Sequence, residues 1–145
     1  MEFNLTEDKQ YSFEEISINQ RDEFEIEVSE ALVEKFAEIS GDYNPLHMDE
    51  SFASSTPFQK RIVHGMLLAS FLSKLVGMKM PRRNGVYFSQ SINFRKPCYI
   101  GEIITVGGTV IDKSESTRII TVKTEIFNKN KECILDGEAK VLFYK

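Results

Sequence analysis

In the first part of the chain, the spacing of apolar residues predicts a strand followed by a helix. Phe24, Ile26 and Val28 alternate with acidic residues, which is the period of a strand with one buried face. Ser29 is a preferred N-cap residue, and after it apolar residues recur at helical spacing until Gly41. The sequence therefore predicts a helix that ends at Gly41.

The middle of the chain combines a polar loop with a strongly apolar segment. Residues 42–57 are dense in Asp, Asn, Ser and Pro, which predicts an irregular loop with one helical turn beginning near Asp49. Residues 64–78 are apolar around much of the helical circumference. A helix of this kind belongs in a protein core.

After Pro81, the pattern has the period of two that is typical of strands. Candidate strands rich in Ile, Val, Thr, Phe and Tyr span residues 85–94, 102–113, 117–128 and 132–143. Short connections with turn residues favour antiparallel pairing of neighbours. The predicted fold class is α+β, an antiparallel sheet covered by one strongly apolar helix.

Length and composition predict one globular domain that covers residues 1–145. The 41% of hydrophobic and 28% of charged residues are unlike the composition of disordered chains. A net charge of −4 gives no overall positive field for nucleic acid. The N-terminal residues form no basic or apolar targeting segment, and no stretch reaches about 18 apolar residues. We therefore expect a cytoplasmic protein with no nucleic-acid or membrane partner.

The two cysteines, Cys98 and Cys133, lie far apart and outside any paired metal or redox motif. This usage fits a reducing cytosol, and we expect both to be small buried apolar residues rather than nucleophiles.

Titratable residues cluster in the polar loop and just after it. The two histidines, His47 and His64, lie close to Asp42 in the sequence. Histidine can accept or donate a proton at neutral pH, and a carboxylate in the same loop could point at the same water. The pairing suits addition or elimination of water, although such residues also serve as hydrogen-bonded scaffolding.

Gly65 begins the apolar helix, where the first backbone N–H groups lack intrahelical partners. A thioester carbonyl could dock there, and one N–H aimed at a developing enolate oxygen stabilises it by about 3 kcal/mol. The alternative is that Gly65 only eases a tight turn into the helix.

The same residues do not match a known metal motif. In an EF-hand loop the third ligand would be Leu46 and the required glycine would be His47, so calcium binding is rejected. His47, Asp49 and His64 could converge on zinc, but a His-Glu-x-x-His or paired-cysteine motif is missing. We expect no metal, and the sequence also lacks a Gly-x-Ser-x-Gly elbow and a phosphate-binding glycine loop. No cofactor is expected.

Two segments, FAEISGDYNPLHMD at residues 36–49 and IVHGM at residues 62–66, resemble the hydratase motif of the MaoC-like family. The resemblance is greatest to the short (R)-specific enoyl-CoA hydratases, which are single-domain hot-dog proteins. It extends over residues 11–14, 87–90 and 97–101 to the end, so nearly the whole chain is covered.

The resemblance implies a hot-dog fold, in which a long central helix is wrapped by a curved antiparallel β-sheet, and a homodimer in which two sheets join. It implies that Asp42 and His47 hold and activate the water, and that the N–H of Gly65 binds the thioester oxygen. Asn44 and His64 are then expected at the substrate, Asn44 in an orienting role.

The expected function is reversible syn addition of water to a trans-2-enoyl-CoA, giving (R)-3-hydroxyacyl-CoA. In this hypothesis Asp42 takes a proton from the attacking water and His47 returns one at C2. The alternatives are a 3-hydroxyacyl-ACP or CoA dehydratase of fatty-acid metabolism, a hot-dog thioesterase, and an acyl-CoA-binding module. The CoA phosphates could meet either Lys79, Arg82 and Arg83 or the pair Arg95 and Lys96.

Overall fold

A computed structural model of the protein describes residues 10–145. In chain order, the elements are β1 (Arg21–Glu27), α1 (Glu30–Ser40), α2 (Pro45–Met48), α3 (Glu50–Ser54), α4 (Gly65–Lys74), η1 (Leu75–Lys79), η2 (Arg82–Asn84), β2 (Gly85–Gln90), β3 (Asn93–Phe94), β4 (Ile103–Ser114), β5 (Ile119–Phe127) and β6 (Cys133–Phe143). None of the helices described is long and apolar enough to cross a membrane.

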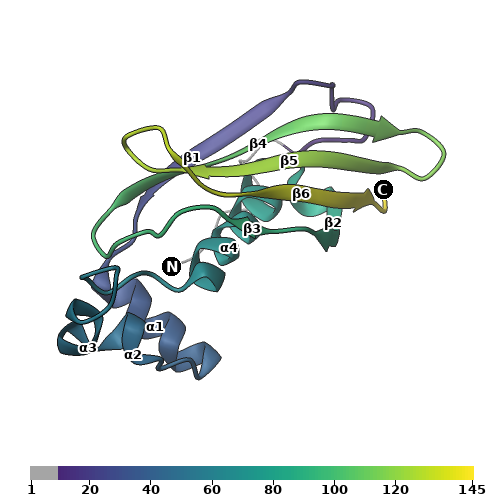
Figure 1. Ribbon diagram of the computed structural model, residues 1–145. Helices are drawn as coiled ribbons and strands as arrows, with labels where there is room; N and C mark the ends of the chain where they lie inside the picture. The colour runs from purple at the N-terminus through teal and green to yellow at the C-terminus, as the bar shows by residue number, and fades with distance from the viewer. Residues whose placement is uncertain (1–9) are drawn as a thin grey trace.

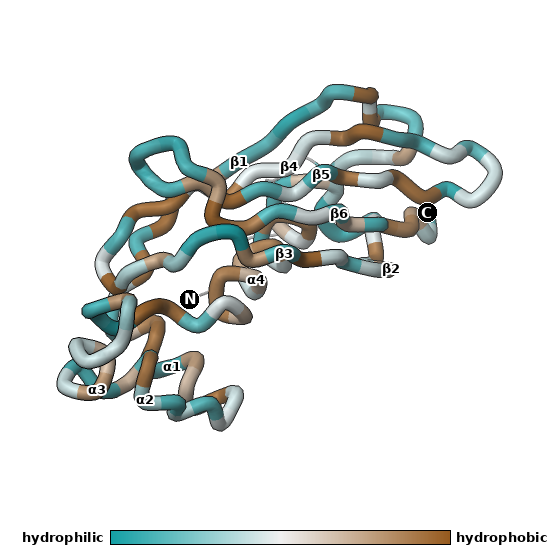
Figure 2. Tube along the Cα trace, in the orientation of Figure 1, coloured by the Kyte–Doolittle hydropathy of each residue, from teal (hydrophilic) through white to brown (hydrophobic). Residues whose placement is uncertain are grey.

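The strands form one antiparallel sheet in the order β1-β4-β5-β6-β2, and β3 also pairs with β6. Figure 1 shows this sheet curving over α4, while α1, α2 and α3 lie together away from the strands. The expected α+β fold with a central helix against an antiparallel sheet is therefore confirmed. Hydrophobic positions recur along α4 and the strands, whereas the loop between β5 and β6 is hydrophilic (Figure 2).

The core lies between α4 and the concave side of the sheet. Alternate residues of β4 and β5 are buried, as the period of a strand with one covered face requires. Two clusters of buried residues result, and α4 with η1 contributes Leu67, Leu68, Phe71, Leu72, Leu75 and Val76 to them. The apolar segment predicted at residues 64–78 is thus the buried helix, with its last turn wound as a π-helix.

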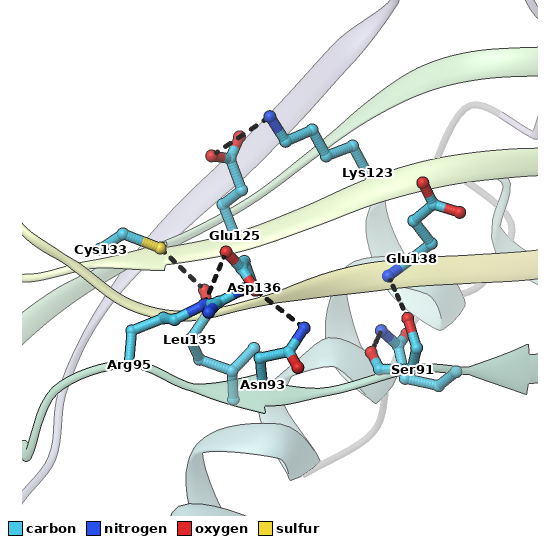
Figure 3. Close-up of polar contacts among 10 residues, drawn as sticks. Ser91, Asn93, Arg95, Lys123, Glu125, Cys133, Leu135, Asp136 and Glu138 are labelled. Atoms are coloured by element: carbon cyan, nitrogen blue, oxygen red, sulfur yellow. Dashed lines mark hydrogen bonds and ion pairs between the residues drawn. The ribbon is translucent and has the colours of Figure 1, made fainter.

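The strand predicted at residues 85–94 is divided into β2 and β3. The register of β2 on β6 shifts between Tyr87 and Ser89, and the ladder is interrupted before β3. Ser91 comes so close to β6 there that a Cβ on Gly137 would collide with its carbonyl oxygen. Figure 3 shows how side-chain contacts then hold this stretch on β6: Ser91 Oγ accepts from the N–H of Glu138.

The polar loop contains more helix than its composition predicted. The turn near Asp49 is confirmed as α3, whose N-cap is Asp49. The preceding helix α2 was not predicted, although Asn44 followed by Pro45 carries its signal: an N-cap residue and a proline at the first helical position. The missed helix carries His47.

Candidate active site

The end of α1 begins a chain of local hydrogen bonds that shapes the loop from Gly41 to His47. Gly41 ends α1 in the left-handed conformation, with φ of 78°. Asp42 Oδ1 then accepts from the N–H of Asn44 at 3.1 Å, and Asn44 Oδ1 accepts from the N–H of Leu46 at 3.0 Å. Asn44 thus caps α2 and sets the direction in which His47 leaves the backbone.

His47 is held through one ring nitrogen. Its Nδ1 lies 2.8 Å from the carbonyl oxygen of Ile62. A carbonyl only accepts, so Nδ1 carries the proton of this bond and Nε2 is the nitrogen that can exchange a proton with a substrate or water.

His64 is the residue before α4 and is 1% exposed. Its Nε2 donates to the backbone carbonyl of Asp42 at 2.9 Å. Its ring centroid lies 4.1 Å from that of His47, with 31° between the planes, and Phe36 meets its edge. His64 therefore connects the backbone of Asp42 to the ring of His47.

Burial lowers the pKa of His64 below its ordinary value of 6.5, and the nearby His47 and Arg61 lower it further, against the hydrogen bond and charge of Asp42. Its Nδ1 is buried and makes no hydrogen bond to any described residue. A neutral imidazole is the form that this environment favours.

A cavity of about 420 Å³ opens beside these groups. It is lined by Asp42, His47, Phe58, Ile62, Val63, His64, Gly65, Met66, Leu68, Phe94, Arg95, Lys96, Pro97 and Cys98. The structure thus brings together four of the five predicted site residues; Asn44 is not among the lining residues and acts as the cap of α2.

Gly65 is the first residue of α4, and the ring of Phe94 lies against it. A Cβ on Gly65 would approach Phe94 Cε1 to 2.7 Å. Hydrogen bonding along α4 begins at Leu67, whose N–H donates to His64 O at 3.0 Å. The N–H of Gly65 precedes it, at the positive end of the helix.

The cluster that could hold a metal differs from the one considered in the sequence. Asp49 caps α3 by accepting from the N–H of Phe52. The residue that lies near both His47 and His64 is Asp42. Their donor atoms lie within 4.8 Å of one another, whereas tetrahedral zinc brings its ligand atoms to about 3.5 Å. The expectation of no metal stays a prediction.

Several cavity residues were missed because they lie far from the loop in sequence. Phe94, Pro97 and Cys98 come from β3 and the segment after it, and periodicity alone does not show that this segment passes Gly65. Two groups of basic residues were considered for CoA. The pair Arg95 and Lys96 lines the cavity, whereas Lys79, Arg82 and Arg83 do not.

Cys98 is buried and free, as expected, whereas Cys133 is only partly buried, so the expectation was wrong for that residue. Burial, followed by the charge and hydrogen bond of Glu102, raises the pKa of the Cys98 thiol to about 12. A thiol that stays protonated is a poor nucleophile.

Known proteins match this chain over most of its length. Residues 12–131 match the family model described as "MaoC like domain". An (R)-specific enoyl-CoA hydratase of Aeromonas caviae is 37% identical over 90% of this chain and 97% of that protein. A 3-hydroxybutyryl-CoA dehydratase of Methylorubrum extorquens is 38% identical over 89% of this chain and 82% of that protein.

A solved structure, the (R)-hydratase from A. caviae involved in PHA biosynthesis, superimposes with a TM-score of 0.86, covering 88% of this chain and 97% of that one at 37% identity. The expected hot-dog fold is confirmed by this likeness. The chain belongs to the MaoC-like domain family.

Proposed function

We propose that the protein is an (R)-specific enoyl-CoA hydratase, which adds water reversibly to trans-2-enoyl-CoA in the syn sense and forms (R)-3-hydroxyacyl-CoA. The observation that carries the proposal is the meeting of Asp42 and His47 at the wall of one cavity beside Gly65. A carboxylate oxygen of Asp42 and a ring nitrogen of His47 lie within 4.8 Å of each other. Both atoms can therefore hydrogen-bond to one water, because each bond spans about 2.8 Å. The A. caviae relative, named for this reaction, supports the assignment.

In the proposed step, the carboxylate of Asp42 is the base and Nε2 of His47 is the acid. Asp42 takes one proton from a water whose oxygen bonds to C3, while C2 receives a proton from Nε2 of His47. Nδ1 takes no part because it donates to Ile62. The proton on Asp42 then returns to His47 through solvent, which restores both groups.

Gly65 supplies the third part of this mechanism. As the double bond is polarised, negative charge develops on the thioester oxygen, and the N–H of Gly65, which has no backbone partner among the described residues, donates to it. The close approach of a ligand to this backbone requires the absence of a side chain. Asn44 and His64 act as positioning residues, through α2 and through the carbonyl of Asp42.

The same site catalyses the reaction in either direction, since acid and base exchange roles in the reverse step. The M. extorquens relative is named as a dehydratase, which favours dehydration of a 3-hydroxyacyl thioester as the second candidate. Coenzyme A and acyl carrier protein both present such thioesters.

We further propose a cytoplasmic location and a role in fatty-acid metabolism. The free thiols of Cys98 and Cys133 suit a reducing compartment, and a chain with net charge −4 has no overall attraction for nucleic acid.

The catalytic pair can be tested by substitution. We expect Asp42→Asn and His47→Gln each to lower the rate of crotonyl-CoA hydration by about 10² to 10⁴, the usual contribution of a positioned acid or base. Loss of conjugated-thioester absorbance measures hydration, and free thiol would reveal a thioesterase instead. Asp49→Asn is the matched control, since Asp49 caps α3 and does not line the cavity. Near-normal turnover by either catalytic variant contradicts the assignment.

The neutral state of His64 predicts a pH dependence of stability. Its pKa is lowered on folding, so the unfolded chain binds more protons as the pH falls from about 6.5 through the folded-state pKa. The free energy of unfolding therefore decreases over this window. Urea denaturation at pH 7.5, 6.5 and 5.5 should show a smaller decrease for His64→Gln than for the wild type. Equal decreases for the two proteins would show that His64 does not cause the effect.

We propose that Arg95 and Lys96 meet the CoA phosphates. Both line the cavity, and their carboxylate partners, Asp136 and Glu132, hold them in exposed ion pairs that exchange at little cost; Figure 3 shows the Arg95 pair. We expect Lys96→Gln to raise KM for crotonyl-CoA by about fivefold, as loss of one exposed charge contact would. KM for crotonyl-pantetheine, which lacks the nucleotide, should not change. Arg83→Gln, outside the cavity, is the control, and equal effects of Lys96→Gln on both substrates would reject the placement.

We propose that the homodimer forms at the β2 edge of the sheet. β2 exposes Val86 and Phe88, the latter to 63%, whereas the opposite edge, β1, carries exposed charged residues that oppose strand pairing. Phe88→Glu should shift the protein from dimer towards monomer in light scattering. Ile111→Glu, at an exposed apolar residue of β4, should leave the dimer intact in the same measurement. A monomeric wild type would disprove the dimer.

A further inference from the structure

Arg61 is a nearly buried cation that the proposed reaction does not use. Its side chain is 12% exposed, although it lies in a segment between a surface loop and α4. Its Nε donates to the carbonyl oxygen of His47 at 2.7 Å, and its Nη1 donates to Glu30 Oε1, also at 2.7 Å. A guanidinium removed from water needs such partners, and both are short, charge-assisted bonds.

We propose that Arg61 is a positioning residue that fixes the helix turn carrying His47, so that Nε2 of His47 stays aimed at the water and C2. The inference rests on the proposed hydratase function. It assigns to Arg61 no contact with the substrate.

The turn α2 needs support from outside because it is four residues long. A single helical turn is unstable alone, and its last carbonyl groups have no partners within the helix. Here Arg61 donates to the carbonyl of His47, and the N–H of Ile62 donates to the carbonyl of Leu46 at 3.3 Å. A cation at this end also complements the helix dipole.

The same segment holds the ring of His47. The carbonyl of Ile62 accepts from Nδ1, so His47 is fixed through its backbone by Arg61 and through its imidazole by Ile62. Loss of the Arg61 bond frees the backbone of His47, which weakens the bond from Nδ1 to the Ile62 carbonyl, and Nε2 then loses its fixed direction.

Glu30 makes the arrangement specific for arginine. It lies in the first turn of α1 and directs the guanidinium, so one planar group joins the start of α1 to the end of α2. A lysine ammonium reaches one of these acceptors but lacks the fixed fork that serves both.

The test compares kcat with KM. Arg61→Met should lower kcat for crotonyl-CoA hydration by about 10- to 100-fold, as small misplacements of a catalytic group do, with KM changed less than about threefold. Arg61→Lys should recover part of kcat, and Glu30→Gln should reduce kcat less than Arg61→Met does. Arg118→Met is the matched control, because Arg118 also bonds one carboxylate, of Glu14, and one carbonyl, of Lys145, far from the cavity.

A second measurement does not depend on turnover. The chain has two histidines, so ¹⁵N NMR of the imidazoles reports on His47 and His64 alone. At a pH where both imidazoles are neutral, we expect His47 in the Nδ1–H form in the wild type and a mixture of tautomers in Arg61→Met. A His47→Gln protein assigns the signals.

The outcomes separate the two hypotheses. A folded Arg61→Met protein with kcat within twofold of the wild type, or one with raised KM and normal kcat, overturns the positioning role. If Arg61→Met does not fold, Arg61→Lys decides: unchanged kcat overturns the proposal, and reduced kcat at unchanged KM supports it. A wild type that does not hydrate enoyl-CoA refutes the proposed function instead, and the tautomer measurement still tests Arg61.

Discussion

The site depends on hydrogen bonds between two segments, residues 61–64 and residues 42–47. Three residues of the first segment reach the second: Arg61 and His64 donate to backbone carbonyls, and the Ile62 carbonyl accepts from the ring of His47. Without them, the Asp42 loop would have no fixed position relative to Gly65. The distance between the acid–base pair and the thioester site is therefore set by this contact.

The first segment can serve as a reference because the core holds it. Ile62 bridges to Tyr99, and the N–H of Val63 donates to the carbonyl of Cys98 at 2.7 Å. Directly after it comes α4, whose apolar side chains are buried against the sheet. The core holds residues 62–64 in place, and these residues in turn hold the Asp42 loop, which lies outside the core. A site that needs accurate geometry requires such support.

Periodicity predicted the buried helix and the long strands, since each has one covered face whose spacing appears in the sequence. It did not predict α2, which is too short for a period, or the break between β2 and β3, where Ser91 lies close against Gly137. The approach of Asp42, His47 and Gly65 could be expected from their motif, but not from spacing. Arg61 escaped prediction because its two partners, Glu30 and His47, lie in other elements.

Asp42 is exposed, and this explains the density of short-range hydrogen bonds around it. A buried side chain is positioned by packing, but a carboxylate that must meet water cannot be enclosed. Local bonds replace packing here: Ser40 Oγ accepts from the N–H of Asp42, Asp42 accepts from Asn44, and His64 donates to the Asp42 carbonyl. The residue types of the Gly-Asp-x-Asn-Pro-x-His segment thus follow from one requirement, which is to keep an accessible carboxylate still.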